Sequence, residues 1–124
     1  MSPRSEEYLD SAVARLATAQ AALSLDPAST VSLAYYAAIY AARGALSERD
    51  RYAKTHRGTW HLFREEFVRT GPFDPKLAGA AASLQRQREE ADYDAVRPSE
   101  HEAAAAVQTA ERFVAAVQAM LANP

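Results

Sequence analysis

The stretch STVSLAYYAAIYAARGAL, residues 29–46, decides the fold class of this chain. Most of its side chains are apolar, and alanine, the residue that favours a helix most strongly, is the commonest of them. Small side chains let a neighbouring helix approach closely, and a helix that is apolar nearly all round is a buried one. The stretch therefore predicts a central helix with others packed around it. The residues expected on its inner face are Val31, Ala34, Tyr35, Ala38, Ala41, Ala42 and Ala45.

Before this stretch, apolar residues recur at three- and four-residue spacing from about Ser5 to Leu23, which predicts another helix. Ser5 is its expected N-cap, because a serine side chain accepts a hydrogen bond from a backbone N–H of the first turn. Residues 26–28, Asp-Pro-Ala, are expected to end it, since proline breaks a helix interior. The buried face of this helix is predicted to contain Leu9, Ala12, Val13, Leu16, Ala19 and Leu23.

Three more helices are predicted after residue 54. A short third helix is capped by Thr55 and ends at Gly71, a fourth begins at Asp74, and a fifth follows Ser99. No segment alternates as a strand would, so the sequence predicts an all-α, up-and-down bundle of five helices in one domain, residues 1–124. The expected inward positions are Trp60, Phe63 and Phe67, then Leu77, Ala80, Ala81, Leu84 and Ala91, then Val107, Ala110, Val114, Val117 and Leu121.

Composition excludes several classes of protein. There is no cysteine, so disulfides and thiolate chemistry are excluded. No apolar run approaches the roughly 18 residues that span a bilayer, and the acidic start does not resemble a signal peptide, so we expect a cytoplasmic protein without membrane contact. Glycine-rich phosphate loops are missing. His61 and Glu65 could share a helix face, but two ligands alone do not predict a site, so we expect no metal and no cofactor.

Positive charge is concentrated in one part of the chain. The net charge is −2, which argues against a generally nucleic-acid-binding surface, yet residues 43–69 hold seven of the fourteen Lys and Arg against four acids. Lys54, His56 and Arg57 lie where the third helix begins, and a helix N-terminus with basic neighbours suits a phosphate. The same residues would also make an ordinary solvated loop, and both interpretations stay open.

Two further groups of side chains are candidates for binding. Tyr35, Tyr36 and Tyr40 could stack with bases, although packing in the core with hydroxyls at its rim is the more favoured interpretation. Arg88 and Asp92 stand four residues apart on the fourth helix and can pair on one face. That pair is either a surface ion pair or part of a phosphate site.

Four stretches carry a resemblance to a known family, and they are residues 34–43, 54–58, 63–71 and 86–94. In order and spacing they resemble the HEPN domains, the "higher eukaryotes and prokaryotes nucleotide-binding" family, over nearly the full chain. The resemblance implies a helical bundle that forms a homodimer. Many members are metal-independent ribonucleases, others bind nucleotides, and several are encoded beside a minimal nucleotidyltransferase as toxin and antitoxin.

The resemblance also points to a site. Active members carry an R-x(4–6)-H motif late in the bundle, whose Arg stabilises charge on the phosphate and whose His moves protons. At the matching place this chain has Arg86 and Arg88, but Asp92 occupies the position of the His. A carboxylate of ordinary acidity is ionised at neutral pH, so it would be a poor acid and would repel an RNA phosphate. Arg51 and His56 fit the same spacing by count, but they precede the third helix.

The functional hypothesis follows from these residues. Arg86, Arg88 and Asp92 are the candidate catalytic residues, and Lys54, His56, Arg57 and Tyr93 are the candidate nucleotide- or phosphate-binding residues. The chain is expected to act on RNA or a nucleotide as the toxin-like component paired with a nucleotidyltransferase antitoxin. The alternative is a noncatalytic nucleotide-binding or protein-interaction domain. A homodimer is also expected because the apolar second helix, with Trp60, Phe63 and Phe67, exceeds what a small bundle easily buries.

Overall fold

The computed structural model describes residues 1–93 and 97–123, and within these ranges every regular element is a helix. A single π-helical turn, η1, continues α3, so the two form one helical segment. The predicted five-helix, up-and-down bundle is confirmed. Asp94, which ends the 86–94 stretch, lies outside the described residues. The elements are α1 (Pro3–Ala22), α2 (Pro27–Ser47), α3 (His56–Phe63), η1 (Arg64–Val68), α4 (Pro75–Tyr93) and α5 (Glu100–Ala122).

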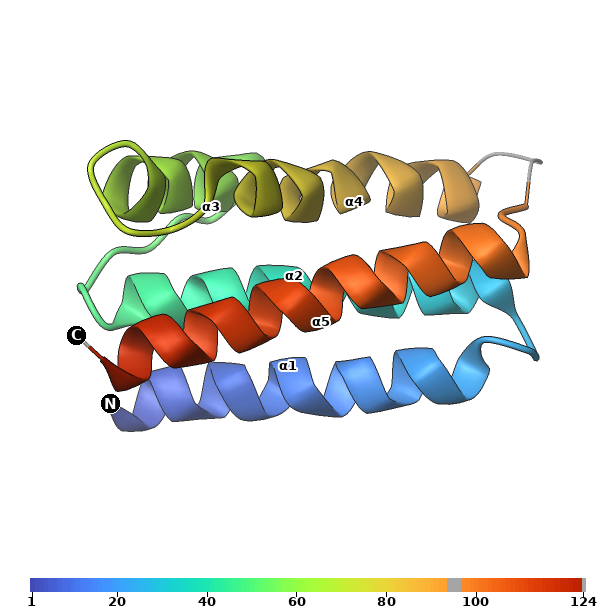
Figure 1. Cartoon of the computed structure of the whole chain (residues 1–124), viewed down its shortest axis with the longest axis horizontal. Helices are drawn as coiled ribbons and strands as arrows, with labels where there is room; N and C mark the ends of the chain where they lie inside the picture. Colours follow the sequence, from blue (N-terminus) through green and yellow to red (C-terminus); the bar gives the residue numbers. More distant parts are fainter. Residues whose placement is uncertain (94–96, 124) are drawn as a thin grey trace.

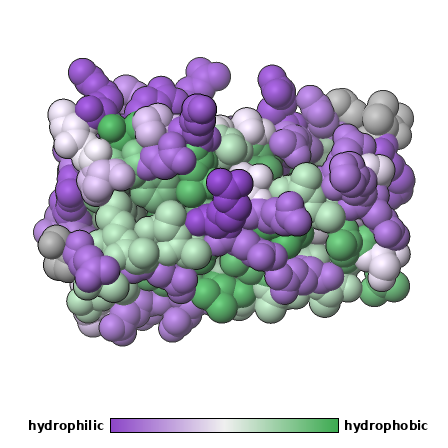
Figure 2. All heavy atoms as spheres, in the orientation of Figure 1, coloured by the Kyte–Doolittle hydropathy of each residue, from purple (hydrophilic) through white to green (hydrophobic). Residues whose placement is uncertain are grey.

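The helices form layers around α2. Figure 1 shows α1 on one side of α2 and α5, and α3 with α4 on the other side. Polar side chains gather along the edge formed by α3 and α4 (Figure 2). No helix within the described residues is long and apolar enough to cross a membrane.

Two helix starts differ from the sequence prediction. Ser2, not Ser5, caps α1, and its Oγ accepts a hydrogen bond from the Ser5 backbone N at 3.2 Å. Ser5 is instead buried and donates to Glu48 Oε2 at 2.7 Å. Asp26 is the N-cap residue of α2, and Pro27 opens that helix. In both cases a proline stands in the first turn, where its missing N–H costs nothing, so the proline starts a helix as well as interrupting one.

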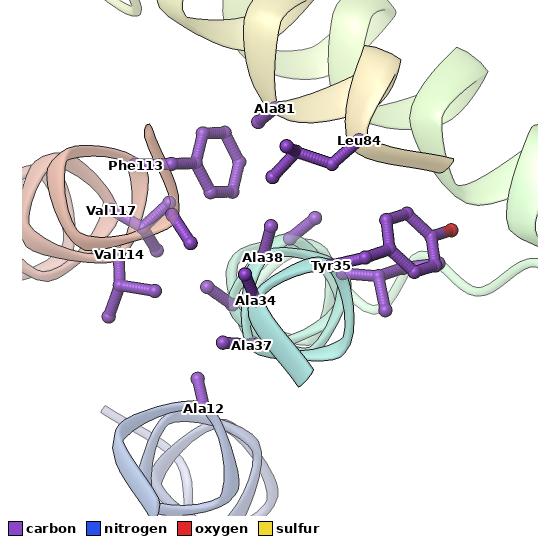
Figure 3. Close-up of a cluster of buried hydrophobic side chains, with 14 of the residues drawn as sticks. Ala12, Ala34, Tyr35, Ala37, Ala38, Ala81, Leu84, Phe113, Val114 and Val117 are labelled. Carbon is purple, nitrogen blue, oxygen red and sulfur yellow. The ribbon is translucent and has the colours of Figure 1, made fainter. Parts of the chain in front are cut away.

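The contact between α1 and α2 is unusually close. A Cβ added to Gly44 of α2 would lie 3.2 Å from Tyr8 Cβ and 3.4 Å from the Ser5 carbonyl oxygen. Two turns earlier Ala37 faces Ala12 of α1 (Figure 3), and both are fully buried. Small side chains at seven-residue spacing thus let the two backbones approach.

All seven positions predicted for the inner face of α2 are buried. Two predicted core positions elsewhere are wrong. Val13 is 47% exposed, and Ala80 is exposed as well. Each lies one residue from a buried alanine, Ala12 or Ala81, and so points about 100° away from the narrow stripe that meets the neighbouring helix.

The aromatic residues of α3 and η1 are internal. Trp60, Phe63 and Phe67 are at most 6% exposed, and Phe63 packs against Phe73 and Phe113 with ring centroids 5.0 and 5.3 Å apart. The expectation that these rings exceed what the bundle can bury is therefore wrong, because Phe113 of α5 and Phe73 of the α3–α4 connection cover them. They give no argument for a homodimer.

Candidate functional site

Arg88 of α4 lies at the centre of a polar cluster on the α3–α4 side of α2. Its guanidinium carbon is 5.5 Å from the ring centre of Tyr35 and 5.6 Å from that of Tyr36. Nη1 donates to Tyr36 Oη at 3.4 Å and to Asp92 Oδ2 at 3.1 Å, and the side chain is only 13% exposed. The Arg88 Nε–H is buried without an acceptor among the described residues. An arginine held on two aromatic faces with an unused donor is a feature expected of a binding site.

Asp92 is fixed from two sides. Besides the Arg88 contact, its Oδ1 accepts a hydrogen bond from Ser32 Oγ of α2 at 2.7 Å. The i, i+4 pairing of Arg88 with Asp92 that the sequence predicted is therefore present. Because both carboxylate oxygens are engaged, Asp92 offsets the charge of Arg88 and holds the guanidinium in place.

His56, the first residue of α3, joins the cluster from the other side. Its ring centre lies 5.5 Å from that of Tyr35 and 6.2 Å from that of Tyr36. Its Nδ1 is 3.0 Å from Tyr35 Oη, and Tyr35 Oη accepts a hydrogen bond from Trp60 Nε1 at 3.3 Å. His56 therefore lies against the same two tyrosine rings as Arg88, although the two residues come from different helices.

Three groups of the cluster have shifted pKa values. Burial raises the pKa of Tyr35 to about 12. Burial, and then the positive charges of Arg43 and Arg88, lower the pKa of His56, with Glu89 opposing them. For Arg88, burial lowers the pKa, but the oxygens of Tyr36 and Asp92 outweigh it and the net pKa is raised. At neutral pH the cluster therefore holds a permanent arginine cation beside a neutral imidazole. Shifted groups gathered in one place are typical of functional sites.

The other predicted site residues lie outside this cluster. Arg86 is 80% exposed on the opposite side of α4, 3.9 Å from Glu90, because two helical positions differ by about 200°. It lines an open groove with Arg57, while Lys54 lines a separate pocket. Tyr93 is 78% exposed, close enough to Arg88 to affect its pKa.

The alternative pair Arg51 and His56 is not joined in the structure. Arg51 Nη1 forms an ion pair with Glu66 Oε1 at 2.7 Å, whereas His56 faces Tyr35. Arg51 and His56 match the R-x(4)-H spacing in sequence, but they contact different residues in the structure.

Sequence reasoning missed Ser32 and Trp60 as parts of this site. Ser32 and Tyr36 stand four residues apart on α2, so both reach the same side toward α4. The four-residue spacing from Tyr36 could therefore have predicted that Ser32 lies near the site. Trp60 was expected only in the core, and its indole N–H could be placed near Tyr35 only once the packing of α3 on α2 was known.

Comparison with known families identifies the chain. The family described as "HEPN domain" matches residues 5–120. The chain belongs to the HEPN family. The resemblance carried by the four stretches is thereby confirmed.

Two curated relatives of this HEPN chain come from Methanocaldococcus jannaschii. The protein named "Putative toxin MJ0605" is 31% identical over 84 residues, 68% of this chain and 63% of the relative. The protein named "Putative toxin MJ0142" is 32% identical over 65 residues, 52% of this chain and 44% of the relative. The match thus spans less than two thirds of either relative.

A solved structure supports the same fold for this HEPN chain. The crystal structure of TT1696 from Thermus thermophilus superposes with a TM-score of 0.77, covering 94% of this chain and 98% of that one. The two sequences are 22% identical, so the likeness concerns the fold alone.

Proposed function

We propose that this HEPN chain is the toxin-like component of a two-component module in the cytoplasm and acts on RNA at the Arg88 cluster. The observation that carries the proposal is the position of Arg88, mostly buried on two tyrosine rings, with His56 and Asp92 beside it. A guanidinium offers several donors in a plane and suits phosphate oxygens. The names of the two archaeal relatives give independent support for a toxin-like role.

In this proposal each side chain has a separate task. Arg88 binds the phosphate and stabilises charge that develops on it. The rings of Tyr35 and Tyr36 lie against the guanidinium of Arg88. Asp92, which is held in turn by Ser32, accepts a hydrogen bond from its Nη1. Asp92 stands where the family motif carries a proton-transferring His, and both of its carboxylate oxygens are already engaged by Arg88 and Ser32, so the proposal expects slow cleavage.

Single-turnover cleavage of a labelled RNA in EDTA tests this assignment. Arg88→Ala is expected to lower the rate about 10²-fold or more, as the loss of one transition-state donor does. Arg112→Ala is the matched control, because Arg112 is an exposed arginine on α5. Equal rates for wild type and Arg88→Ala, with both folded by circular dichroism, would place the site elsewhere.

A noncatalytic phosphate-binding domain is the second candidate. The observation that favours it is the Asp92 contact with Arg88, since the motif position that would carry a proton-transferring His holds a carboxylate instead. In that case the wild type binds RNA but does not cleave it. Affinity would still depend on Arg88 and would fall with rising salt, because the binding energy comes from phosphate contacts.

A nucleotidyltransferase is the partner that this proposal assigns. The test is growth of a host expressing the chain alone and together with a nucleotidyltransferase encoded beside it. The proposal expects slow growth that the partner relieves, and growth that is normal in both cases would count against it.

We further propose that the chain works as a homodimer, as the family resemblance implies. Light scattering at micromolar concentration is expected to give about twice the 13.5 kDa chain mass. A monomer at high concentration would contradict this.

A further inference from the structure

Three side chains form a hydrogen-bonded row that ends at His56. Trp60 Nε1 donates to Tyr35 Oη at 3.3 Å, and Tyr35 Oη lies 3.0 Å from His56 Nδ1. Tyr35 is completely buried in the chain, and Trp60 is 6% exposed. The row therefore links the interior of the bundle to an imidazole at the edge of the Arg88 cluster.

The chemistry of the donors fixes the direction of this row. An indole N–H can only donate, so Tyr35 Oη accepts from Trp60. The hydroxyl proton of Tyr35 then needs an acceptor, and His56 Nδ1 is the one available among the described residues. If Nδ1 carried a proton, two donors would point at the phenol oxygen and a buried hydroxyl proton would have no partner. Buried polar groups without partners are rare because they are costly.

We propose that Trp60 and Tyr35 hold His56 as the tautomer protonated on Nε2, and that this N–H donates to an RNA phosphate oxygen beside Arg88. The contact with an RNA phosphate rests on the function proposed above, whereas the tautomer of His56 concerns the chain alone. In the described part of the chain His56 Nε2 makes no hydrogen bond, so its donor is available to a ligand. Tyr35 and Trp60 are positioning residues in this account.

The surroundings of His56 agree with a neutral ring. Burial and the positive charges of Arg43 and Arg88 lower its pKa, and Glu89 is the opposing acidic group. Tyr35 retains its proton, because burial raises its pKa to about 12. The tyrosine can therefore donate a hydrogen bond to Nδ1 without giving up the proton.

The tautomer determines what His56 can do. With Nδ1 occupied by the Tyr35 hydroxyl, Nε2 presents a proton and has no lone pair for a base. Taking up a proton from RNA would require the Tyr35 contact to break. His56 thus acts as a neutral donor that recognises phosphate together with Arg88.

Nitrogen-15 NMR of the histidine rings at about pH 7.5, above the ordinary histidine pKa, tests the tautomer of His56 without any RNA. The expected spectrum has His56 protonated on Nε2 alone, while exposed His101 gives an unconstrained reference in the same sample. Tyr35→Phe removes the hydroxyl and should move the His56 signals toward a mixture of tautomers. Tyr40→Phe is the matched control on the same helix and should leave them unchanged. A wild-type His56 protonated on Nδ1, or cationic at this pH, would overturn the proposal.

RNA binding by two His56 variants tests whether the Nε2 N–H donates to an RNA phosphate. The amide of His56→Gln can place an N–H donor near the position of Nε2, and His56→Leu cannot. The expected result is near-normal affinity for His56→Gln and about a tenfold or greater loss for His56→Leu, as for a hydrogen bond to a charged group. Equal loss in both variants would show that a donor at this place is not the role of His56. If the wild type binds no RNA, both the proposed function and the phosphate contact of His56 are wrong. The tautomer of His56 is tested separately by the NMR experiment.

Discussion

The two sides of α2 are built in opposite ways. Toward α1, a Cβ added to Gly44 would lie 3.2 Å from Tyr8 Cβ, and the small side chain of Ala37 faces that of Ala12 (Figure 3). Toward α3 and α4 the same helix carries Tyr35, Tyr36 and Ser32, whose polar atoms meet His56, Arg88 and Asp92.

The side of α2 that faces α1 fixes the position of the helix, and the side that faces α3 and α4 carries the polar site. Close packing of small side chains leaves little room for α2 to move, since protein interiors pack as densely as crystals of small molecules. The polar side chains on the other side are therefore presented from a rigid element. A site whose side chains come from rigid helices holds its geometry better than one placed on loops.

The largest expected effect comes from a core aromatic residue that lies behind the polar side. Phe113 is fully buried and its ring lies 5.6 Å from that of Trp60, which donates to Tyr35. Phe113→Ala should lower the free energy of unfolding by about 3–5 kcal/mol, the usual range for an aromatic core truncation. Urea denaturation measures this. Tyr93→Ala, at an exposed aromatic, is the control and should change stability by less than about 0.5 kcal/mol.

A smaller effect is expected from enlarging the tightly packed side. Ala37→Leu should cost about 1–3 kcal/mol, because a leucine does not fit opposite Ala12 without moving α1 or α2. Ala80→Leu makes the same exchange at an exposed helix position and should be nearly neutral. Equal stabilities for the two variants in urea would remove the contrast between the two sides of α2.

The smallest effect concerns pH on the polar side. The pKa of His56 is lower in the folded chain than the ordinary value of about 6.5 that applies when the chain is unfolded. Below about pH 6.5 the unfolded chain binds more protons, so stability falls as the pH drops through the folded pKa. Wild type should lose more stability than His56→Gln between about pH 7.5 and 5.5 in urea unfolding, a window that spans the unfolded pKa. The other two histidines are present in both proteins and cancel in the comparison.

How much the sequence could predict differs between the same two sides. The buried face of α2 followed from the spacing of apolar residues, and all seven of its predicted positions are buried. The Arg88–Asp92 pair followed from i, i+4 geometry on a single helix. Local periodicity was enough in both cases, because each involves residues of one helix.

The contacts between helices could not be predicted in this way. Lys54, His56 and Arg57 are close in sequence, but Lys54 precedes α3, and His56 and Arg57 point about 100° apart on it, so that only His56 faces Tyr35. Arg86 was grouped with Arg88 and points to the opposite side of α4. The composition of the site depends on how α3 and α4 rotate about their axes when they pack on α2, which the spacing within each helix does not fix.

Single-turnover cleavage of a labelled RNA by Asp92→His in EDTA is the sharpest test of how the Arg88 cluster acts. The proposed function requires that the Arg88 cluster acts on RNA and that a carboxylate at position 92 keeps cleavage slow. An imidazole has an ordinary pKa near about 6.5, so it can move protons at neutral pH, and the exchange removes a negative charge beside Arg88. The rate of Asp92→His is expected to exceed that of wild type by about 10²- to 10⁴-fold, the usual contribution of general acid–base catalysis, with no gain when Arg88→Ala is added. An active wild type whose Asp92→His variant is inactive would contradict it, because Asp92 would then already be the catalytic base.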